Sequence, residues 1–199
     1  GLGDVYKRQL QYHPVFAALR DLVREGALGR LQYIYSNRLS LGKFRVEEDV
    51  FWSFAPHDVS MILALADSPV EAVAAHGSAF VTAGVTDVAM CQLGFASGLR
   101  AHVFTSWSHP FKEQRLVAIG EEGMAVFEDS HPEWGRKLAI YRHRIDRGGP
   151  VPIPTAVAPE YPTIAPGEPL KDECREFIAS IAEGRQPRTD ACLLYTSDA

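Results

Sequence analysis

The sequence predicts an α+β domain built on an open, mostly antiparallel sheet with helices on one face. Three observations support this class. Two segments with helical spacing of apolar residues come early, a run of short strand-like segments follows, and an amphipathic helix comes last. Helices and strands segregated along the chain in this way are typical of α+β domains. Most connections between the strand-like segments are too short for crossovers, so neighbouring strands should pair antiparallel.

The first helix is expected over residues 14–26. Pro14 suits its first turn, and a glycine, at 26 or 29, ends it. Its apolar residues recur at helical spacing: Phe16, Leu19, Leu22 and Val23. Residues 30–41 then alternate as a strand, with Leu31, Tyr33, Tyr35 and Asn37 on one side and Gln32, Ile34, Ser36 and Arg38 on the other.

A second helix is expected from Pro56 to Ala66, after a polar connection. Proline favours a first helical turn, and the Asp-Ser-Pro sequence at 67–69 ends the apolar run. Segments rich in Val, Phe and Ala follow, and we expect them to be strands, at 70–81, 86–95, 98–108, 113–120, 123–129 and 137–145. Turn signals separate the first five of them, among them the His-Pro-Phe-Lys sequence at 109–112.

The last part of the chain combines an irregular segment with a helix. Residues 148–167 hold six prolines and little periodicity, so an extended surface loop is expected there. Residues 168–184 form an amphipathic helix that ends at Gly184. Its apolar face holds Leu170, Cys174, Phe177, Ile178 and Ile181.

Composition excludes several classes of protein. The 199 residues carry a net charge of -5 with scattered Lys and Arg, which gives no case for nucleic-acid binding. No apolar run approaches the roughly 20 residues that cross a bilayer, so no membrane partner is expected. Three cysteines without metal-ligand spacing favour a reducing compartment, the cytoplasm. No metal site is predicted, because the histidines have no trusted ligand partners at metal spacing.

The two ends of the chain do not continue the patterns of their neighbours. Residues 1–9 and 192–199 resemble translated sequencing-adapter sequence, so we expect residues 10–191 to be a protein fragment that has lost both ends. The Gly-Leu-Gly-Asp-Val-Tyr start does not qualify as a dinucleotide-binding fingerprint. No strand precedes it, and Tyr6 stands where a small residue is needed.

The second expected helix begins with a titratable pair, His57 and Asp58. The positive end of the helix dipole would stabilise a negative Asp58, which we expect to cap the turn, and would lower the pKa of His57. A neutral imidazole is suited to accept a proton from a sugar or alcohol hydroxyl, as a general base does. A structural histidine near a helix start is the alternative, and position alone does not separate the two.

Side chains near this pair are expected to complete a polar pocket. Trp52 provides an aromatic wall, and Asn37, Arg38 and Lys43 come from the preceding strand and loop. With Asp58, they form the predicted substrate-binding set, suited to a sugar or an anionic group. A solvated loop is the alternative explanation for these charges.

Several segments together resemble the C-terminal domain of the Gfo/Idh/MocA oxidoreductases, the relatives of glucose–fructose oxidoreductase and inositol dehydrogenase. The resemblance covers nearly all of residues 10–191 and rests on Phe-Ala-Pro-His-Asp-Val-Ser after a tryptophan, Ser-Trp-Ser-His-Pro-Phe-Lys-Glu-Gln-Arg, and Glu-Pro-Leu-Lys-Asp-Glu-Cys-Arg-Glu-Phe-Ile. It implies a dihydrodipicolinate-reductase-like sheet domain that binds a sugar or nucleotide-sugar substrate and forms homo-oligomers.

The resemblance also implies a mechanism. A separate Rossmann domain would bind NAD or NADP and supply a lysine from a Glu-Lys-Pro motif, and His57 matches the histidine that works with that lysine. Many members carry an aspartate four residues before the histidine, where this chain has Ser53. Residues 10–191 contain neither a Glu-Lys-Pro motif nor a glycine fingerprint, so the fragment is expected to be inactive alone.

A second class of function stays open. The same sheet would suit a non-catalytic binding or assembly module in which His57 is structural. In either case the outward face of the sheet has few charges, and exposed apolar sheet of this extent usually marks an interface. A second copy of the chain is therefore the expected partner.

Overall fold

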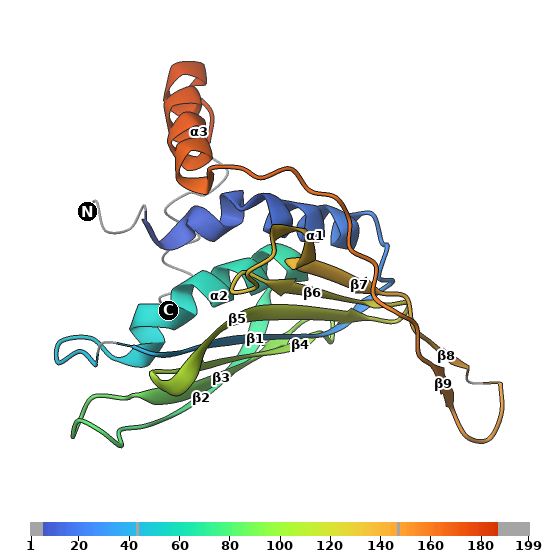
Figure 1. Ribbon diagram of the computed structural model, residues 1–199, viewed down its shortest axis with the longest axis horizontal. Helices are drawn as coiled ribbons and strands as arrows, with labels where there is room; N and C mark the ends of the chain where they lie inside the picture. The colour runs from blue at the N-terminus through green and yellow to red at the C-terminus, as the bar shows by residue number, and fades with distance from the viewer. Residues whose placement is uncertain (1–5, 43, 147, 187–199) are drawn as a thin grey trace.

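A seven-stranded sheet forms the centre of the molecule, as a computed structural model of the chain shows (Figure 1). The structure describes residues 6–42, 44–146 and 148–186. The expectations for residues 1–5 and 192–199 lie outside them, and a short 3-10 helix, η2 (Tyr6–Tyr12), crosses the boundary expected at residue 9. The strands are β1 (Leu31–Leu41), β2 (Val70–Ser78), β3 (Val88–Phe95), β4 (Arg100–Ser106), β5 (Ser108–Gly120), β6 (Met124–Glu128) and β7 (Leu138–Tyr141).

The order of the strands across the sheet is β2-β3-β4-β1-β5-β6-β7. Every neighbouring pair is antiparallel except β1 and β4, which run parallel. The prediction of an open, mostly antiparallel sheet is confirmed. β1 lies at the centre because β4 and β5, which are consecutive in the chain, pair with its two edges. The buried Trp107 connects β4 to β5 at the end of β1.

The expected turn at residues 109–112 is wrong. These residues belong to β5, which begins at Ser108 beside Leu41 of β1. Proline is tolerated there because the pairing of β1 with β5 is irregular between Leu39 and Leu41, so the ladder needs no regular donor at Pro110.

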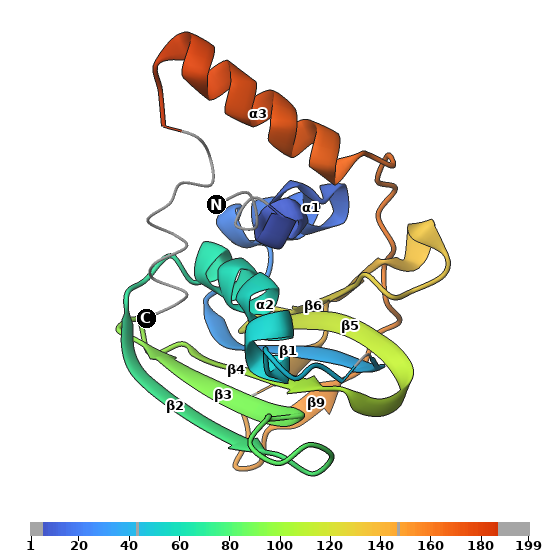
Figure 2. The same cartoon turned by 90° about the vertical axis from the view of Figure 1, so that its left-hand side faces the viewer.

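Two helices cover one face of the sheet, α1 (Pro14–Arg24) and α2 (Val50–Ala66), as predicted (Figures 1 and 2). Alternate strand residues point toward them and form the core with the apolar sides of the helices. The largest of these side chains include Phe16, Leu19, Ile34, Ile62, Leu116 and Phe127. The opposite face, called the open face below, is covered by none of the helices that the described residues form (Figure 2).

The second helix begins six residues earlier than predicted. Asp49 is its N-cap, and the Asp49 carboxylate accepts a hydrogen bond from the Trp52 N–H at 2.9 Å. Pro56 lies inside the helix, where the missing N–H leaves the carbonyl of Trp52 without its usual intrahelical donor. A proline is a helix-start signal only when no better cap precedes it, and Asp49 is a better cap.

The chain beyond β7 forms a projecting hairpin and then returns. β8 (Arg144–Asp146) pairs with β9 (Ile153–Thr155), so the expected strand at 137–145 is divided and the expected loop at 148–167 contains a short strand. The returning segment, residues 156–168, is called the strap below. It bridges to the edge of the main sheet, where Glu160 and Ile140 exchange backbone hydrogen bonds at 2.8 and 2.9 Å.

The last helix, α3 (Pro169–Glu183), is confirmed, with Gly184 in the left-handed conformation at its end. It lies beyond α1 and η2, away from the sheet (Figure 2). The side chains buried along it are polar, Glu173 and Ser180. The apolar face predicted for it is exposed, including Phe177, Ile178 and Ile181. Among the described helices, none combines the length and the apolar character that a bilayer crossing requires.

Candidate functional site

His57 lies in the third turn of α2, half-buried, and not at a helix start. The field of a helix dipole falls off within the first turn, so the dipole explanation for a neutral His57 is wrong. Ser53 lies one turn earlier on the same side of the helix and Ser60 one turn later. Gln11 of η2 donates to the Ser60 carbonyl at 2.8 Å, so this side of α2 faces η2.

The helix turn that carries His57 is tied to the sheet by a buried ion pair. The Arg38 Nε atom lies 2.5 Å from Asp58 Oδ2, and the Ser36 hydroxyl donates to Asp58 Oδ1 at 2.5 Å. Only 1% of Asp58 and 8% of Arg38 are exposed. The sequence led us to expect that Asp58 caps the helix, and this expectation is wrong, because Asp49 is the N-cap. The Asp58 carboxylate instead attaches the middle of α2 to β1.

The predicted substrate-binding side chains divide between the two faces of the sheet. Arg38 points toward α2, whereas Asn37 points to the open face and donates to the Glu113 carboxylate at 2.9 Å. Asn37 therefore does not line one pocket with Arg38. Trp52 is 42% exposed near the start of α2, about 140° around the helix from His57. Lys43 lies outside the described residues.

A second group of charges, partly buried, lies beside Arg38, and the sequence did not indicate it. Asp129 accepts a hydrogen bond from Lys137 Nζ at 2.7 Å and lies 3.4 Å from His13 Nε2. Burial opposes ionisation of Asp129, yet Lys137, His13 and Arg38 together hold the pKa of its carboxyl below the usual value. Burial also lowers the pKa of His13, against the attraction of Asp129 and with the repulsion of Lys137.

His13 also caps the first turn of α1. Its Nδ1 atom accepts the Val15 N–H at 3.2 Å and so caps α1. That bond requires the proton of a neutral ring to sit on Nε2, which faces Asp129. His13 before α1, Arg38 of β1, Asp129 after β6 and Lys137 before β7 meet only in the folded chain. No spacing in the sequence predicts this meeting.

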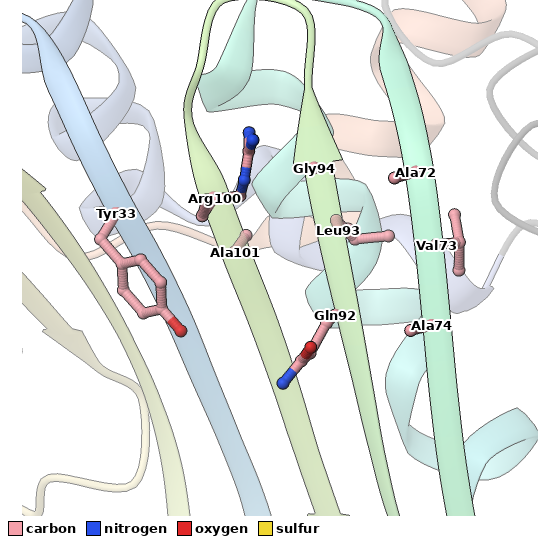
Figure 3. A pocket seen from close by; sticks show the side chains of 9 residues that line it. All are labelled: Tyr33, Ala72, Val73, Ala74, Gln92, Leu93, Gly94, Arg100 and Ala101. Carbon is pink, nitrogen blue, oxygen red and sulfur yellow. The ribbon is translucent and has the colours of Figure 1, made fainter.

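The open face carries a shallow groove at its β2 end, with a volume of about 350 Å³ (Figure 3). Small residues of β2, β3 and β4 form much of its lining, and Tyr33, Gln92 and Arg100 stand around it. The Tyr33 hydroxyl lies 2.8 Å from His102 Nδ1, and the His102 ring stacks on Tyr35. Burial lowers the pKa of His102.

Comparison with known proteins identifies the family. The GFO/IDH/MocA C-terminal domain matches residues 16–126, which include β1, α2 and His57. The chain belongs to the Gfo/Idh/MocA family. Among curated proteins, none matches the chain.

Solved structures of Gfo/Idh/MocA-type proteins share this fold. UDP-N-acetylglucosamine 3-dehydrogenase GnnA from Acidithiobacillus ferrooxidans superimposes with a TM-score of 0.74 at 22% identity, over 95% of this chain and 57% of that one. Aldose-aldose oxidoreductase from Caulobacter crescentus, complexed with glycerol, has a TM-score of 0.70 at 20% identity, over 91% and 54%. Levoglucosan dehydrogenase, in complex with NADH and L-sorbose, has a TM-score of 0.69 at 19% identity, over 92% and 57%. The chain thus spans little more than half the length of these proteins.

The residues that the structure describes do not fit a dinucleotide by themselves. A dinucleotide fold needs a strand, a glycine-rich turn and a helix that lead directly to a parallel neighbouring strand. β1 and β4 form the parallel pair of the main sheet, but the chain between them passes through α2, β2 and β3.

Proposed function

We propose that this Gfo/Idh/MocA chain is the substrate-binding and catalytic-histidine part of an NAD(P)-dependent sugar or nucleotide-sugar dehydrogenase. The observation that carries the proposal is the position of His57: a half-buried histidine on a helix turn anchored to the central strand, within the segment that matches the family. The similar structures, which include two sugar dehydrogenases, support the substrate class.

In this proposal His57 moves the proton of the substrate hydroxyl. Its imidazole accepts that proton as a general base while the carbon is oxidised, and a bound nicotinamide would supply the hydride acceptor. Ser53, one turn earlier, is too weak a base to share this work. Asp58 and Arg38 hold the turn in place, because breaking their buried pair would leave a charge without compensation.

The substrate pocket of the proposal lies on the helix side of the sheet. Trp52, which is exposed but about 140° around α2 from His57, would contact a part of the substrate that extends away from His57. Lys43, outside the described residues, remains a proposed binding residue. Arg38 and Asp58 would shape the pocket from beneath, since both are buried. Asn37 would act only on the other face, where it lies beside Glu113.

The cofactor would be bound by a part of the protein that this chain does not span, and residues 10–191 alone would then be inactive. The lengths of the similar structures support this, because nearly half of each lies outside the match. The exposed apolar face of α3 also supports it. Phe177, Ile178 and Ile181 are each more than half exposed. An exposed apolar patch of this kind usually marks a contact surface, here for the part of the protein that this chain does not span.

The open face of the sheet would form the contact with a second copy of the chain. This face carries exposed apolar side chains, among them Met90 on β3 and Phe111 on β5. The groove of Figure 3 lies on its β2–β4 half. Sedimentation of the 199-residue chain should show a dimer or larger. The variant Met90→Glu places charge on this half of the face and should shift the equilibrium toward monomer.

The catalytic proposal is tested with the chain fused to the dinucleotide-binding domain of a family member. Formation of reduced nicotinamide is followed with a panel of sugars and nucleotide sugars. His57→Asn should lower kcat by roughly 10²-fold or more, as loss of a general base does. His76→Asn on the exposed strand β2 is the matched control and should leave kcat unchanged. Equal turnover in the His57 variant would favour a non-catalytic binding or assembly module.

A further inference from the structure

The turn of α2 that carries His57 is weakly held by the helix itself. Pro56, directly before His57, has no N–H group, so the Trp52 carbonyl lacks its usual intrahelical donor. The Ser60 hydroxyl donates to the His57 carbonyl at 2.9 Å. A serine that bonds back to its own helix in this way often bends it. The backbone of α2 alone therefore defines the direction of the His57 side chain less firmly than an unbroken helix would.

Contacts from outside the helix hold this turn on two opposite sides. The first is the buried pair of Asp58 with Arg38 of β1. The second comes from Gln11 of η2, whose Nε2 atom donates to the Ser60 carbonyl at 2.8 Å and lies 3.4 Å from the Ser60 hydroxyl oxygen. Ser60 is about 200° around the helix from Asp58. Because Ser60 in turn bonds to the His57 carbonyl, a chain of hydrogen bonds links Gln11 to the backbone of His57.

The segment that carries Gln11 is itself well supported. η2 contacts α1, α2 and α3 (Figure 2). His13, which follows η2, caps α1, and its ring centroid lies 5.4 Å from that of Trp134 in the short 3-10 helix η3 (Trp134–Arg136). Trp134 Nε1 donates to the Ile164 carbonyl of the strap at 2.7 Å. Several elements therefore fix the backbone from which Gln11 reaches α2.

A buried glutamine suits orientation better than stability. Gln11 and Ser60 are each 3% exposed. Burying an amide removes it from water, a cost that an apolar side chain of the same size avoids. The hydrogen bonds that replace those to water add little net stability. They do add direction, because the amide N–H has to point at the Ser60 carbonyl.

We propose that Gln11 is a positioning residue, which fixes the turn of α2 so that the His57 imidazole lies within hydrogen-bond reach of the substrate hydroxyl. The inference rests on the proposed function of His57 as a general base. Gln11 transfers no proton itself and acts through Ser60. A general base has to lie about 2.6–3.2 Å from the group whose proton it accepts, so a displacement of about 1 Å lowers the rate strongly.

The test uses the chain fused to the dinucleotide-binding domain of a family member. Gln11→Met removes the donor but keeps the length of the side chain, and the Ser60 carbonyl keeps its intrahelical donor, so the fold should be retained. We expect kcat to fall about tenfold and KM to change less than about twofold, because a displaced base affects the reaction and not the binding of substrate. Gln32→Met, at an exposed position of β1, is the matched control and should leave both constants unchanged.

A double-mutant cycle separates positioning from a merely structural role. If Gln11 acts only through His57, Gln11→Met should have no further effect on kcat in the His57→Asn background. Thermal unfolding of each variant ensures that kcat is compared well below Tm. Gln11→Leu, which also lacks a donor, repeats the comparison and should lower kcat in the same way.

The possible results distinguish this inference from the proposed function. Unchanged kcat in both Gln11 variants, or a loss that persists in full in the His57→Asn background, would overturn the positioning role. So would a lower Tm with no change in kcat. In these cases the proposed function stands as long as His57→Asn itself lowers kcat. Equal turnover of His57→Asn and the parent protein would overturn the proposed function, and the positioning role with it.

Discussion

Replacing Asp58 with asparagine should destabilise the protein more than any change of a surface charge. Asp58 is 1% exposed and accepts from Arg38 Nε at 2.5 Å, Arg38 Nη2 at 3.4 Å and the Ser36 hydroxyl at 2.5 Å. The asparagine retains the shape but not the charge, so the guanidinium of Arg38, itself 8% exposed, loses its counter-ion in a site with little water.

The expected cost follows from that burial. Removing one partner of a buried ion pair costs about 3–5 kcal/mol, and we expect the lower end because the amide still accepts a bond from Ser36. For a chain of this size, about 3 kcal/mol corresponds to a fall in Tm of roughly 6–12 °C. The double variant Arg38→Met with Asp58→Leu removes both charges and should lie within about 1 kcal/mol of the parent protein.

Urea unfolding of the chain, followed by tryptophan fluorescence and circular dichroism, measures these free energies. Glu121→Gln is the matched control. It also breaks a short ion pair, to Arg30 at 2.6 Å, but both partners are partly exposed, so the cost should be below about 1 kcal/mol. An Asp58→Asn variant that loses no more stability than Glu121→Gln would refute the reasoning, as would a double variant that is no better than Asp58→Asn.

Two further predictions concern pH and packing. Burial lowers the pKa of His13 and of His102, so the unfolded chain binds protons that the folded chain does not, and stability should fall as pH drops below 6.5 toward the folded pKa values. Tm measured from pH 8 to 5 should show this, and His13→Asn, which keeps a capping side chain, should flatten the slope; an unchanged slope would contradict it. Gly120→Ala should cost about 2 kcal/mol or more in urea unfolding, because the new Cβ would lie 2.0 Å from the Leu28 carbonyl oxygen. Gly135→Ala, with no neighbouring atom within 4 Å, should change stability by less than about 0.5 kcal/mol, and similar losses in both variants would contradict the contact.

Local patterns in the sequence were enough for the fold class. The alternation over residues 30–41 places Ile34 and Ser36 on the same side of β1, which the structure buries. The short connections dictated antiparallel pairing, and Gly184 marked the end of α3. These features depend on the preferences of neighbouring residues, which act over a few positions and can be read directly from the chain. Family membership is also a property of the amino-acid sequence, because the match over residues 16–126 rests on residue types and their order.

Only the tertiary structure decided how the site is built. Pro56 looked like a helix start, but α2 begins after its Asp49 cap, so His57 lies beyond the first turn where the dipole acts. The pairing of Asp58 with Arg38 depends on where α2 crosses β1, and the separation of Asn37 from Arg38 follows once one face of β1 is covered. Contacts between distant segments are set by the register and crossing of whole elements. No local pattern encodes that geometry, because each residue alone is compatible with many partners.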